Sequence, residues 1–447
     1  MPFEHMTPIR QAWLADVRTA ISRFPLPVLA FLLCFAALLW RCRERLLRAH
    51  LWAEDGELFF PDALRLGYGA TFEPYAGYLH VLPRLLSATF VHLPLEQYAL
   101  LINLSCLAIY AASAALLARP SLRALIPSDG LRVIGAVALC FLPGLWEVLS
   151  NVANLHSAVF LAAMLLGLKD LDRPLRAWEA ALLLFIGATA GEMVVLLPVF
   201  VLRGCLRWQR GDCRQAQAME WVAVSIMLGW ALLNGWMASR SLKTLGAENL
   251  QPDIDVLLYA LTAVSTLSAR FLLQPLLGDK ATIWMYSHLT VMASVSLAFL
   301  AVLAWRLLAS RNRMVLVLAL AALCAWAVLP LTWIVRPGSA TVYPFLRPPN
   351  LAIFEHRYAW TGTPLAVVLW LVVMQSHSTL RRQPGLAMGL CVLIGVFVWH
   401  RGTLTTFGTQ EDWRGTLAKL RSIAPGQFGE APTNPNPRKI VVQGPVP

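Results

Sequence analysis

Long apolar runs recur along the chain from residue 25 to residue 400, separated by short polar segments. A membrane-spanning helix needs roughly 20 mainly apolar residues, so this pattern predicts an all-α polytopic membrane protein. Segment 79–94 is apolar but interrupted by Pro83, Arg84 and His92, so we expect a re-entrant or interface-lying helix. Segment 256–273 has both flanks outside, so we expect it to lie along the outer interface. The pattern indicates about 11 transmembrane helices, with 177–202 counted as two: 25–40, 95–118, 131–146, 155–168, 177–202, 219–237, 283–308, 314–335, 358–374 and 386–399.

The composition agrees with this class. Hydrophobic residues make up 58% of the chain and charged residues 14%, against about 25% charged in a soluble protein. The net charge of +12 comes from basic residues that lie mostly between apolar segments, so it indicates topology, and no nucleic-acid-binding motif accompanies it. The eight cysteines form no CxxC pair, which argues against a disulfide framework or a zinc site.

Basic loops predict the orientation of the helices. The N-terminal apolar run follows three arginines and has no small-residue cleavage site, so we interpret it as a retained signal anchor with a cytoplasmic N-terminus. Run 177–202 allows two interpretations. A single span would place Arg203, Arg207 and Arg210 outside, whereas two short helices with a turn near Gly191 keep that basic loop inside, as the positive-inside rule favours. Loop 41–94 and the tail 401–447 are then extracytoplasmic, and 439–443 has the pattern of a short strand.

The first outer loop carries adjacent carboxylates, Glu54 and Asp55, beside Trp52 at the expected headgroup level. A partly desolvated carboxylate near a membrane is costly and therefore a functional candidate. The pair could act as a base or bind a divalent metal (Mg or Mn); the alternative is a solvated loop. We expect three other acids of the loop to be solvated: Glu57, Asp62 and Glu73.

The same loop continues with aromatic and basic residues. Tyr75 and Tyr78 offer flat faces with hydroxyl groups, which suit stacking on a sugar. His80 and Arg84 are four residues apart and so share a helix face. Arg84 lies in an apolar segment and needs a partner, either a lipid phosphate or one of the carboxylates.

Polar residues also occupy the later outer turns. Glu147, Asn151, Asn154 and His156 crowd the turn between the third and fourth spans, and Glu192 lies at the next outer turn. Together they predict a polar-lined outer cavity in which the asparagines bond sugar hydroxyls; singly, each could be an ordinary helix-end residue. A last outer cluster suits a phosphate leaving group or, alternatively, snorkelling at the interface: Arg347, His356, Arg357 and Tyr358.

No Walker A motif, Rossmann fingerprint, HExxH or GxSxG sequence occurs. An activated donor would therefore come from outside the chain, and the membrane is its plausible source.

With these features the chain resembles the GT-C superfamily of integral membrane glycosyltransferases, which use polyprenyl-phosphate sugars. The resemblance rests on the acidic pair within Trp52-Ala53-Glu54-Asp55-Gly56, outer-face amphipathic helices, paired short helices and the late Arg357-Tyr358. It implies a GT-C-like catalytic domain over 1–400 in the plasma (inner) membrane, with 401–447 as a short tail.

The resemblance further implies that a sugar is transferred, with inversion, to a glycan, lipid or protein acceptor at the extracytoplasmic face. Asp55 would take the acceptor proton, and Glu54 would assist or hold a metal. Arg84, Arg347 and Arg357 would neutralise the lipid-phosphate leaving group.

The alternative is a multi-pass transporter or flippase of lipid-linked or anionic solutes. A transporter should carry inverted repeats and charged residues at mid-span, whereas here the ionisable residues collect at the outer ends of spans. The depth of the ionisable residues in the membrane therefore discriminates between the two classes. Residues that line one outward cavity indicate the enzyme, and charges that run through the protein indicate transport.

Overall fold

The computed structural model describes residues 25–75, 77–142, 145–244, 312–335, 362–375, 412–433 and 438–447, with scattered positions between 274 and 309. It is mostly helical. The first half contains α2 (Leu26–Arg41), α3 (Arg43–Leu47), η1 (Asp55–Phe59), α4 (Phe60–Leu66), η2 (Gly67–Phe72), α5 (Val81–Phe90), η3 (Leu95–Gln97), α6 (Tyr98–Ala115), η4 (Leu116–Ala118), η5 (Pro120–Leu122), α7 (Asp129–Leu139) and α8 (Leu145–Val148). The second half contains α9 (Leu155–Gly167), α10 (Ala177–Gly187), η6 (Gly191–Leu196), α11 (Leu197–Gln209), α12 (Arg214–Thr244), α16 (Arg313–Val335), α18 (Thr363–Gln375), α20 (Trp413–Arg421), β1 (Phe428–Pro432) and β2 (Lys439–Gln443).

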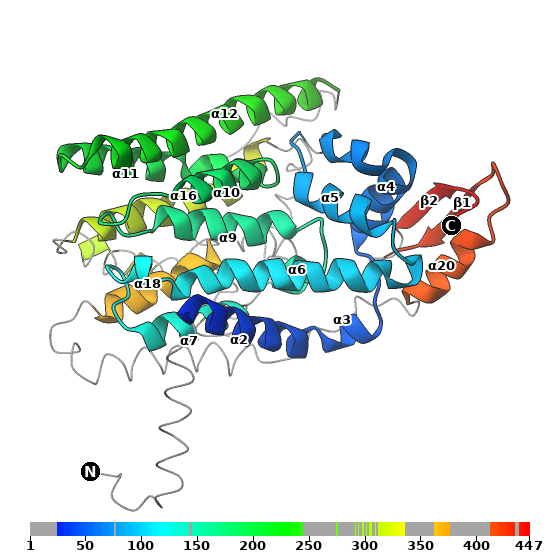
Figure 1. Cartoon of the computed structure of the whole chain (residues 1–447), viewed down its shortest axis with the longest axis horizontal. Coiled ribbons are helices and arrows are strands. Elements are labelled where there is room, and N and C mark those ends of the chain that lie inside the picture. The colour runs from blue at the N-terminus through cyan, green and yellow to red at the C-terminus, as the bar shows by residue number, and fades with distance from the viewer. Residues whose placement is uncertain are drawn as a thin grey trace, which may run out of the picture.

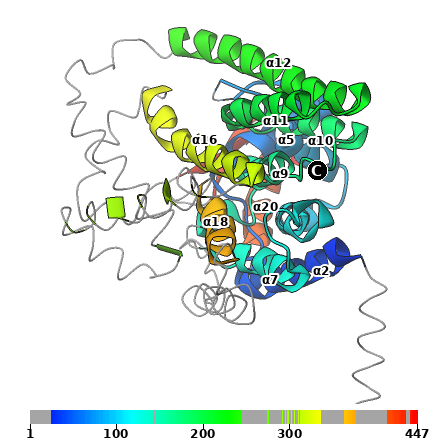
Figure 2. The ribbon, with the colours of Figure 1, turned by 90° about the vertical axis from the view of Figure 1, so that its left-hand side faces the viewer.

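Helix α9 is the centre of the bundle. Every residue from Leu155 to Gly167 is buried, as expected of a helix that is apolar on all sides. Helices α6, α10, α11 and α16 pack against it. Figure 1 shows α2, α6 and α9 running side by side along the long axis, and the end view in Figure 2 places α10, α11 and α12 on one side and α2 and α7 on the other.

Two helices are long and apolar enough to cross a membrane, Leu95–Ala118 and Arg214–Arg240, counted over the described residues. Shorter apolar helices include Leu26–Arg41, Leu155–Gly167 and Ala177–Gly187. Predicted segments 256–273 and 386–399 lie outside the described residues, and 283–308 lies almost wholly outside them. The number of about 11 spans therefore stays a prediction.

The run 177–202 folds as two helices. Helix α10 ends at Gly187, the turn 188–190 follows, and η6 and α11 continue to Gln209. The interpretation as paired short helices is confirmed. The basic residues after it are not a loop, however, because Arg203 and Arg207 belong to α11 and are buried.

The predicted span 131–146 is too long. Helix α7 ends at Leu139, and α8 begins only at Leu145. Pro143 and Gly144 stand between them in the sequence, and proline cannot continue a helix. The buried guanidinium of Arg41 donates to the carbonyl oxygens of Cys140 (2.5 Å) and Leu142 (3.3 Å), which satisfies carbonyl groups just beyond α7.

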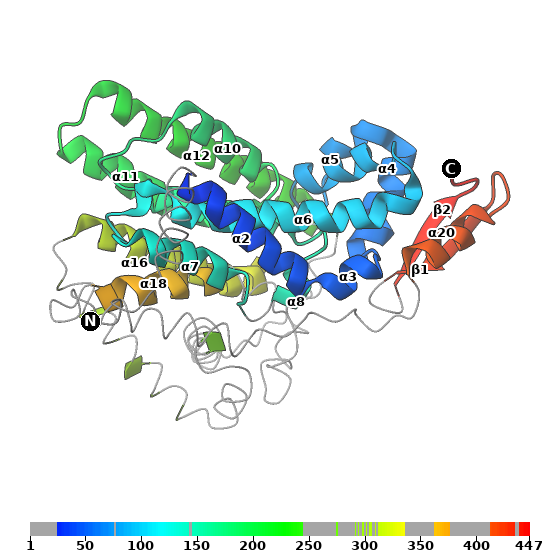
Figure 3. The same cartoon turned by 60° about the horizontal axis from the view of Figure 1, so that its bottom comes forward.

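The C-terminal segment is a small folded unit. Asp412 caps α20 by accepting a hydrogen bond from the Gly415 amide (3.0 Å). Strands β1 and β2 pair antiparallel, with Phe428 opposite Gln443, and β2 covers the predicted strand 439–443. Ile440 and Val442 are buried while the alternate residues of β2 are exposed, the expected pattern of a strand with one covered face. Figure 3 shows this unit at the end of the bundle beside α3 and α4.

Candidate functional site: an acidic pair at one end of the bundle

Asp55 is the first residue of η1 and is 1% exposed. Its Oδ1 accepts a hydrogen bond from the Ala153 amide (2.8 Å) and its Oδ2 one from the Val152 amide (3.1 Å). Burial raises the pKa of this carboxyl to about 8; the Ala153 and Val152 amides act against that shift, and the charge of Glu54 adds to it. Asp55 is therefore a strong carboxylate base held in a fixed orientation.

The backbone on both sides of this contact is strained. Among the described residues, the non-glycine residues with positive φ are Ala53 (36°) and Ser150 (62°). One precedes the acidic pair and the other precedes the loop that bonds Asp55. Such conformations cost on the order of 1–3 kcal/mol and persist where the surrounding structure holds them, which is common at functional sites.

The loop that holds Asp55 is built by Asn151 and Asn154. Their side-chain amides donate to the carbonyl oxygen of Glu147 (2.6 and 2.8 Å). The backbone N–H of Asn154 donates to Oδ1 of Asn151 (2.9 Å). Both asparagines are buried, at 0% and 2% exposure. The sequence predicted that they bond sugar hydroxyls; in the structure their amide groups order the loop and so direct two backbone N–H groups at Asp55.

His156 and Glu192 form a side-chain pair on the same side of the bundle, with Nδ1 of His156 against Oε1 of Glu192. The histidine lies in the first turn of α9 and the carboxylate in η6. Both side chains are partly exposed, at 11% and 14%. Two turns that are distant in sequence therefore meet here, whereas the polar-lined cavity stays a prediction.

The aromatic part of the outer loop docks on the turn before η6. The Val81 amide donates to the Ala188 carbonyl (3.0 Å), and the Leu82 amide donates to Oγ1 of Thr189 (3.2 Å). A Cβ at Gly191 would lie 2.9 Å from Cγ of Tyr78, so the tyrosine ring packs where only glycine leaves room. This contact places the Tyr78 ring against Gly191, the residue before Glu192.

Tyr75, Tyr78 and His80 cluster with Phe59. The rings of Tyr78 and His80 have centroids 4.1 Å apart, and His80 is 3% exposed. Tyr75 and Tyr78 are half-buried. Their faces therefore stack partly on protein, and His80 lies within the cluster.

Arg84 pairs with a carboxylate. Its Nη1 lies 2.9 Å from Oδ2 of Asp62, its guanidinium lies over the Phe59 ring at 5.4 Å, and it is 2% exposed. The sequence left two partners open for Arg84, a lipid phosphate or a carboxylate, and in the structure its partner is the carboxylate of Asp62. The expectation that Asp62 is solvated is wrong, because it binds Arg84 and its side chain is 15% exposed. Glu57 binds Arg438 but is 32% exposed, and Glu73 is exposed as expected.

Arg438 is the site residue that the sequence analysis missed. It precedes β2, and its Nη1 lies 2.7 Å from Oε2 of Glu57 and 3.4 Å from Oε1 of Glu54. One indication of this contact was present in the sequence, the assignment of the tail to the same outer face as the acidic pair. Four predicted site residues lie outside the described residues: Arg347, His356, Arg357 and Tyr358.

The donor set around the acidic pair does not fit a resident divalent metal. Asp55 is 1% exposed and each of its oxygens accepts one amide hydrogen, and Glu54 lies against a guanidinium, so the protein itself supplies the hydrogen-bond donors and the positive charge beside the pair. Within the described parts of the chain, no three His, Cys, Asp or Glu side chains lie together as metal ligands. The cationic partner of Glu54 is Arg438.

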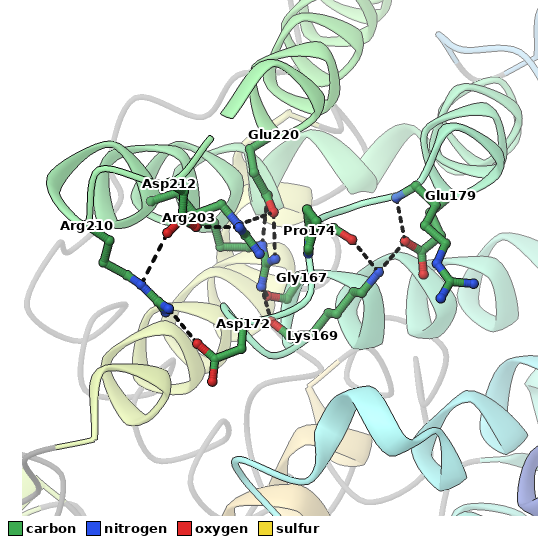
Figure 4. Close-up of polar contacts among 11 residues, drawn as sticks. Gly167, Lys169, Asp172, Pro174, Glu179, Arg203, Arg210, Asp212 and Glu220 are labelled. Carbon is green, nitrogen blue, oxygen red and sulfur yellow. Dashed lines mark hydrogen bonds and ion pairs between the residues drawn. The ribbon is translucent and has the colours of Figure 1, made fainter. Parts of the chain in front are cut away.

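A second polar cluster, whose contacts Figure 4 shows, lies where α11 meets α12, at the end of the bundle opposite α4 (Figure 1). Glu220 of α12 accepts from Arg203 (2.8 and 3.0 Å) and Arg207 (3.0 Å) of α11, and all three are buried. Lys169 donates to Glu179 (2.5 Å) and to the Pro174 carbonyl (2.7 Å). Arg207 also pairs with Asp212 (2.5 Å), so each cation of the cluster has a carboxylate partner and the contacts tie the helices together.

No known family profile, curated protein or solved structure matches the chain.

Proposed function

We propose that the protein is an integral membrane glycosyltransferase that moves a sugar from a polyprenyl-phosphate donor to an extracytoplasmic acceptor. The observation that carries this proposal is Asp55, a buried carboxylate of raised basicity, beside Glu54. It lies at one end of the helical bundle, where the polar turns around Asn151 and Glu192 also lie. A general base is most effective when its pKa lies near the working pH, and burial moves Asp55 toward that range.

In the proposed step, an acceptor hydroxyl gives its proton to the Asp55 carboxylate while its oxygen bonds to the anomeric carbon. The bond between that carbon and the phosphate oxygen breaks, and its electron pair leaves on the polyprenyl phosphate. A carboxylate has about four acceptor positions, so two remain after the bonds from Val152 and Ala153. Attack opposite the leaving group inverts the anomeric centre.

The membrane assignment rests on where the apolar surface lies. Helix α12 exposes Trp221, Leu228, Leu232 and Trp236, with exposed fractions from 41% to 67%. A contiguous apolar surface of this kind is typical of contact with lipid or with another protein. Helix α6 continues through η4 as the second long apolar segment, Leu95–Ala118.

The distribution of buried charge favours an enzyme over a transporter. Within the described residues, Asp55 and Arg84 are buried at the acidic-pair end, and Arg203 and Glu220 are buried where α11 meets α12. Two other buried arginines, Arg41 and Arg132, donate to the carbonyl groups of Cys140 and Ile126, which flank α7. A transporter would instead carry such groups near the middle of its helices. An active site at one face of the membrane fits this arrangement.

The test uses detergent-purified protein and radiolabelled polyprenyl-phosphate sugars, with transfer of label to an acceptor as the readout. Asp55→Asn should lower transfer by at least about 100-fold, since general-base catalysis contributes about 10²–10⁴. Asp172→Asn, an exposed carboxylate at the opposite end, should transfer as the wild type does. Wild-type transfer by a folded Asp55→Asn protein would remove Asp55 from the mechanism, and greater loss in Glu54→Gln than in Asp55→Asn would make Glu54 the base.

A further inference from the structure

The C-terminal segment is a wall of the acidic site. The backbone amide of Trp413 donates to the Ala49 carbonyl (2.8 Å) and its indole Nε1 donates to the Leu95 carbonyl (2.5 Å). Trp413 also meets Phe60 edge-to-face, with ring centroids 5.2 Å apart. These buried contacts anchor α20 on both sides of the outer loop, so the tail is part of the same folded body.

The hairpin reaches the acidic pair at Gly56. Oγ1 of Thr433 donates to the Leu51 carbonyl (3.0 Å) just before the pair. A Cβ at Gly56 would lie 2.6 Å from Oγ1 of Thr433 and 3.0 Å from Cγ1 of Ile440. The glycine that follows Asp55 therefore lets the tail approach the η1 backbone closely.

Arg438 brings a fixed positive charge to this contact. Glu54 and Glu57 are three residues apart on consecutive helical turns, so their side chains share a face. The Arg438 guanidinium lies between them, at 2.7 Å from Glu57 and 3.4 Å from Glu54. Glu54 is 9% exposed, and its Oε2 is buried without a hydrogen-bond partner among the described residues.

We propose that Arg438 is a positioning residue that supplies the positive charge which the acidic pair would otherwise take from a divalent cation. A guanidinium is permanently charged and donates through a planar fork, so it can hold Glu54 and Glu57 at once. Glu54 is thereby kept beside Asp55 with Oε2 free to accept a further hydrogen bond. The site then works without a resident metal, and the C-terminal segment is required for it.

The first test needs no activity. Thermal unfolding in detergent is measured with and without millimolar Mg²⁺ or Mn²⁺ for wild type, Arg438→Ala, Arg438→Gln and Lys439→Ala. Lys439 is the matched control, because it is the next residue and pairs with Glu430 on the exposed face of the hairpin. We expect no metal-dependent rise of Tm in the wild type or Lys439→Ala, and a rise in both Arg438 variants, whose vacated carboxylates can accept the cation. A metal-dependent rise in the wild type, or none in Arg438→Ala and Arg438→Gln, would overturn the proposal.

The second test rests on the proposed function and uses the transfer assay. Wild-type transfer should survive a chelator, Arg438→Ala should lose about 10- to 100-fold, and Arg438→Lys should recover part of that loss. Added Mn²⁺ should restore transfer to Arg438→Ala and leave Lys439→Ala unchanged. Loss of wild-type transfer in the chelator would overturn the role of Arg438. If the wild type transfers no sugar from any donor, the glycosyltransferase proposal fails, and the unfolding test alone decides the role of Arg438.

Discussion

Asp55 is subject to two opposing effects. Removal from water favours its neutral form, and the Val152 and Ala153 amides favour its charged form. Burial is the larger effect, so its pKa is raised from 3.8 to about 8. The folded protein therefore holds a proton at Asp55 over a pH range in which the unfolded chain has released it.

This difference predicts a pH-dependent stability. A group whose pKa is raised by folding stabilises the protein fully below its unfolded pKa, and that contribution is lost as the pH rises through the folded pKa. The Tm of the wild type should therefore fall relative to that of Asp55→Asn between about pH 4 and about pH 8. Thermal unfolding of the two proteins across this range measures the difference.

Transfer should change in the opposite direction. A base must be ionised, so the wild-type rate should rise as the pH approaches about 8 and then level off.

In the thermal-unfolding test, a constant Tm difference between wild type and Asp55→Asn across the range would contradict the raised pKa of Asp55.

Helices α11 and α12 are joined by a buried ion-pair cluster. Glu220 accepts from both Arg203 and Arg207, and Nη1 of Arg203 also donates to the Gly167 (3.2 Å) and Lys169 carbonyl oxygens at the end of α9. Glu220 is the carboxylate partner of Arg203, Arg207 also pairs with Asp212 (2.5 Å), and the contacts join three helices. Loss of one member of such a cluster leaves uncompensated charge in the interior.

Glu220→Ala should therefore lower the free energy of unfolding by about 3–5 kcal/mol, because it leaves Arg203 buried without a counterion. Asp172→Ala removes an ion pair with Arg210 from the same end, but Asp172 is 72% exposed, so the loss should be at most about 1 kcal/mol. Chemical unfolding in detergent measures both. Equal losses would show that the buried cluster adds no more than a surface pair.

At the scale of the whole molecule, the two polar clusters lie at opposite ends of the bundle. Helix α4, which follows the acidic pair and η1, shares one end with the C-terminal hairpin (Figures 1 and 3), and the junction of α11 and α12, whose cluster Figure 4 shows, lies at the other. If the bundle crosses a membrane, these ends face different compartments. The predicted orientation places the acidic pair outside.

Cysteine labelling tests this orientation. Cys213 is exposed beside Asp212 of the Glu220 end, and Arg65 is exposed at the acidic-pair end. A membrane-impermeant maleimide should label Arg65→Cys in intact cells and Cys213 only after permeabilisation, as read by peptide mapping. Labelling of Cys213 in intact cells with no labelling of Arg65→Cys would invert the topology.

The local sequence determined several of the described helices. The predicted segments 155–168 and 314–335 match α9 (Leu155–Gly167) and α16 (Arg313–Val335) within one residue, and 95–118 matches Leu95–Ala118. Apolar length and the break by proline or glycine are properties of neighbouring residues, so the sequence carries them directly. The two short helices in 177–202 were likewise predicted from local sequence, because the basic residues after that apolar run favour a cytoplasmic position.

Only the tertiary structure decided the partners of the charged and polar groups. Arg84 and Asp62 are 22 residues apart, and Arg438 and Glu57 are 381 apart. An ion pair needs its two groups within a few ångströms, and no local pattern determines which distant segments come that close. The acidic pair was therefore identifiable from the sequence. The loop that bonds Asp55 and the arginine beside Glu54 were identifiable only from the folded structure, which brings these distant segments together.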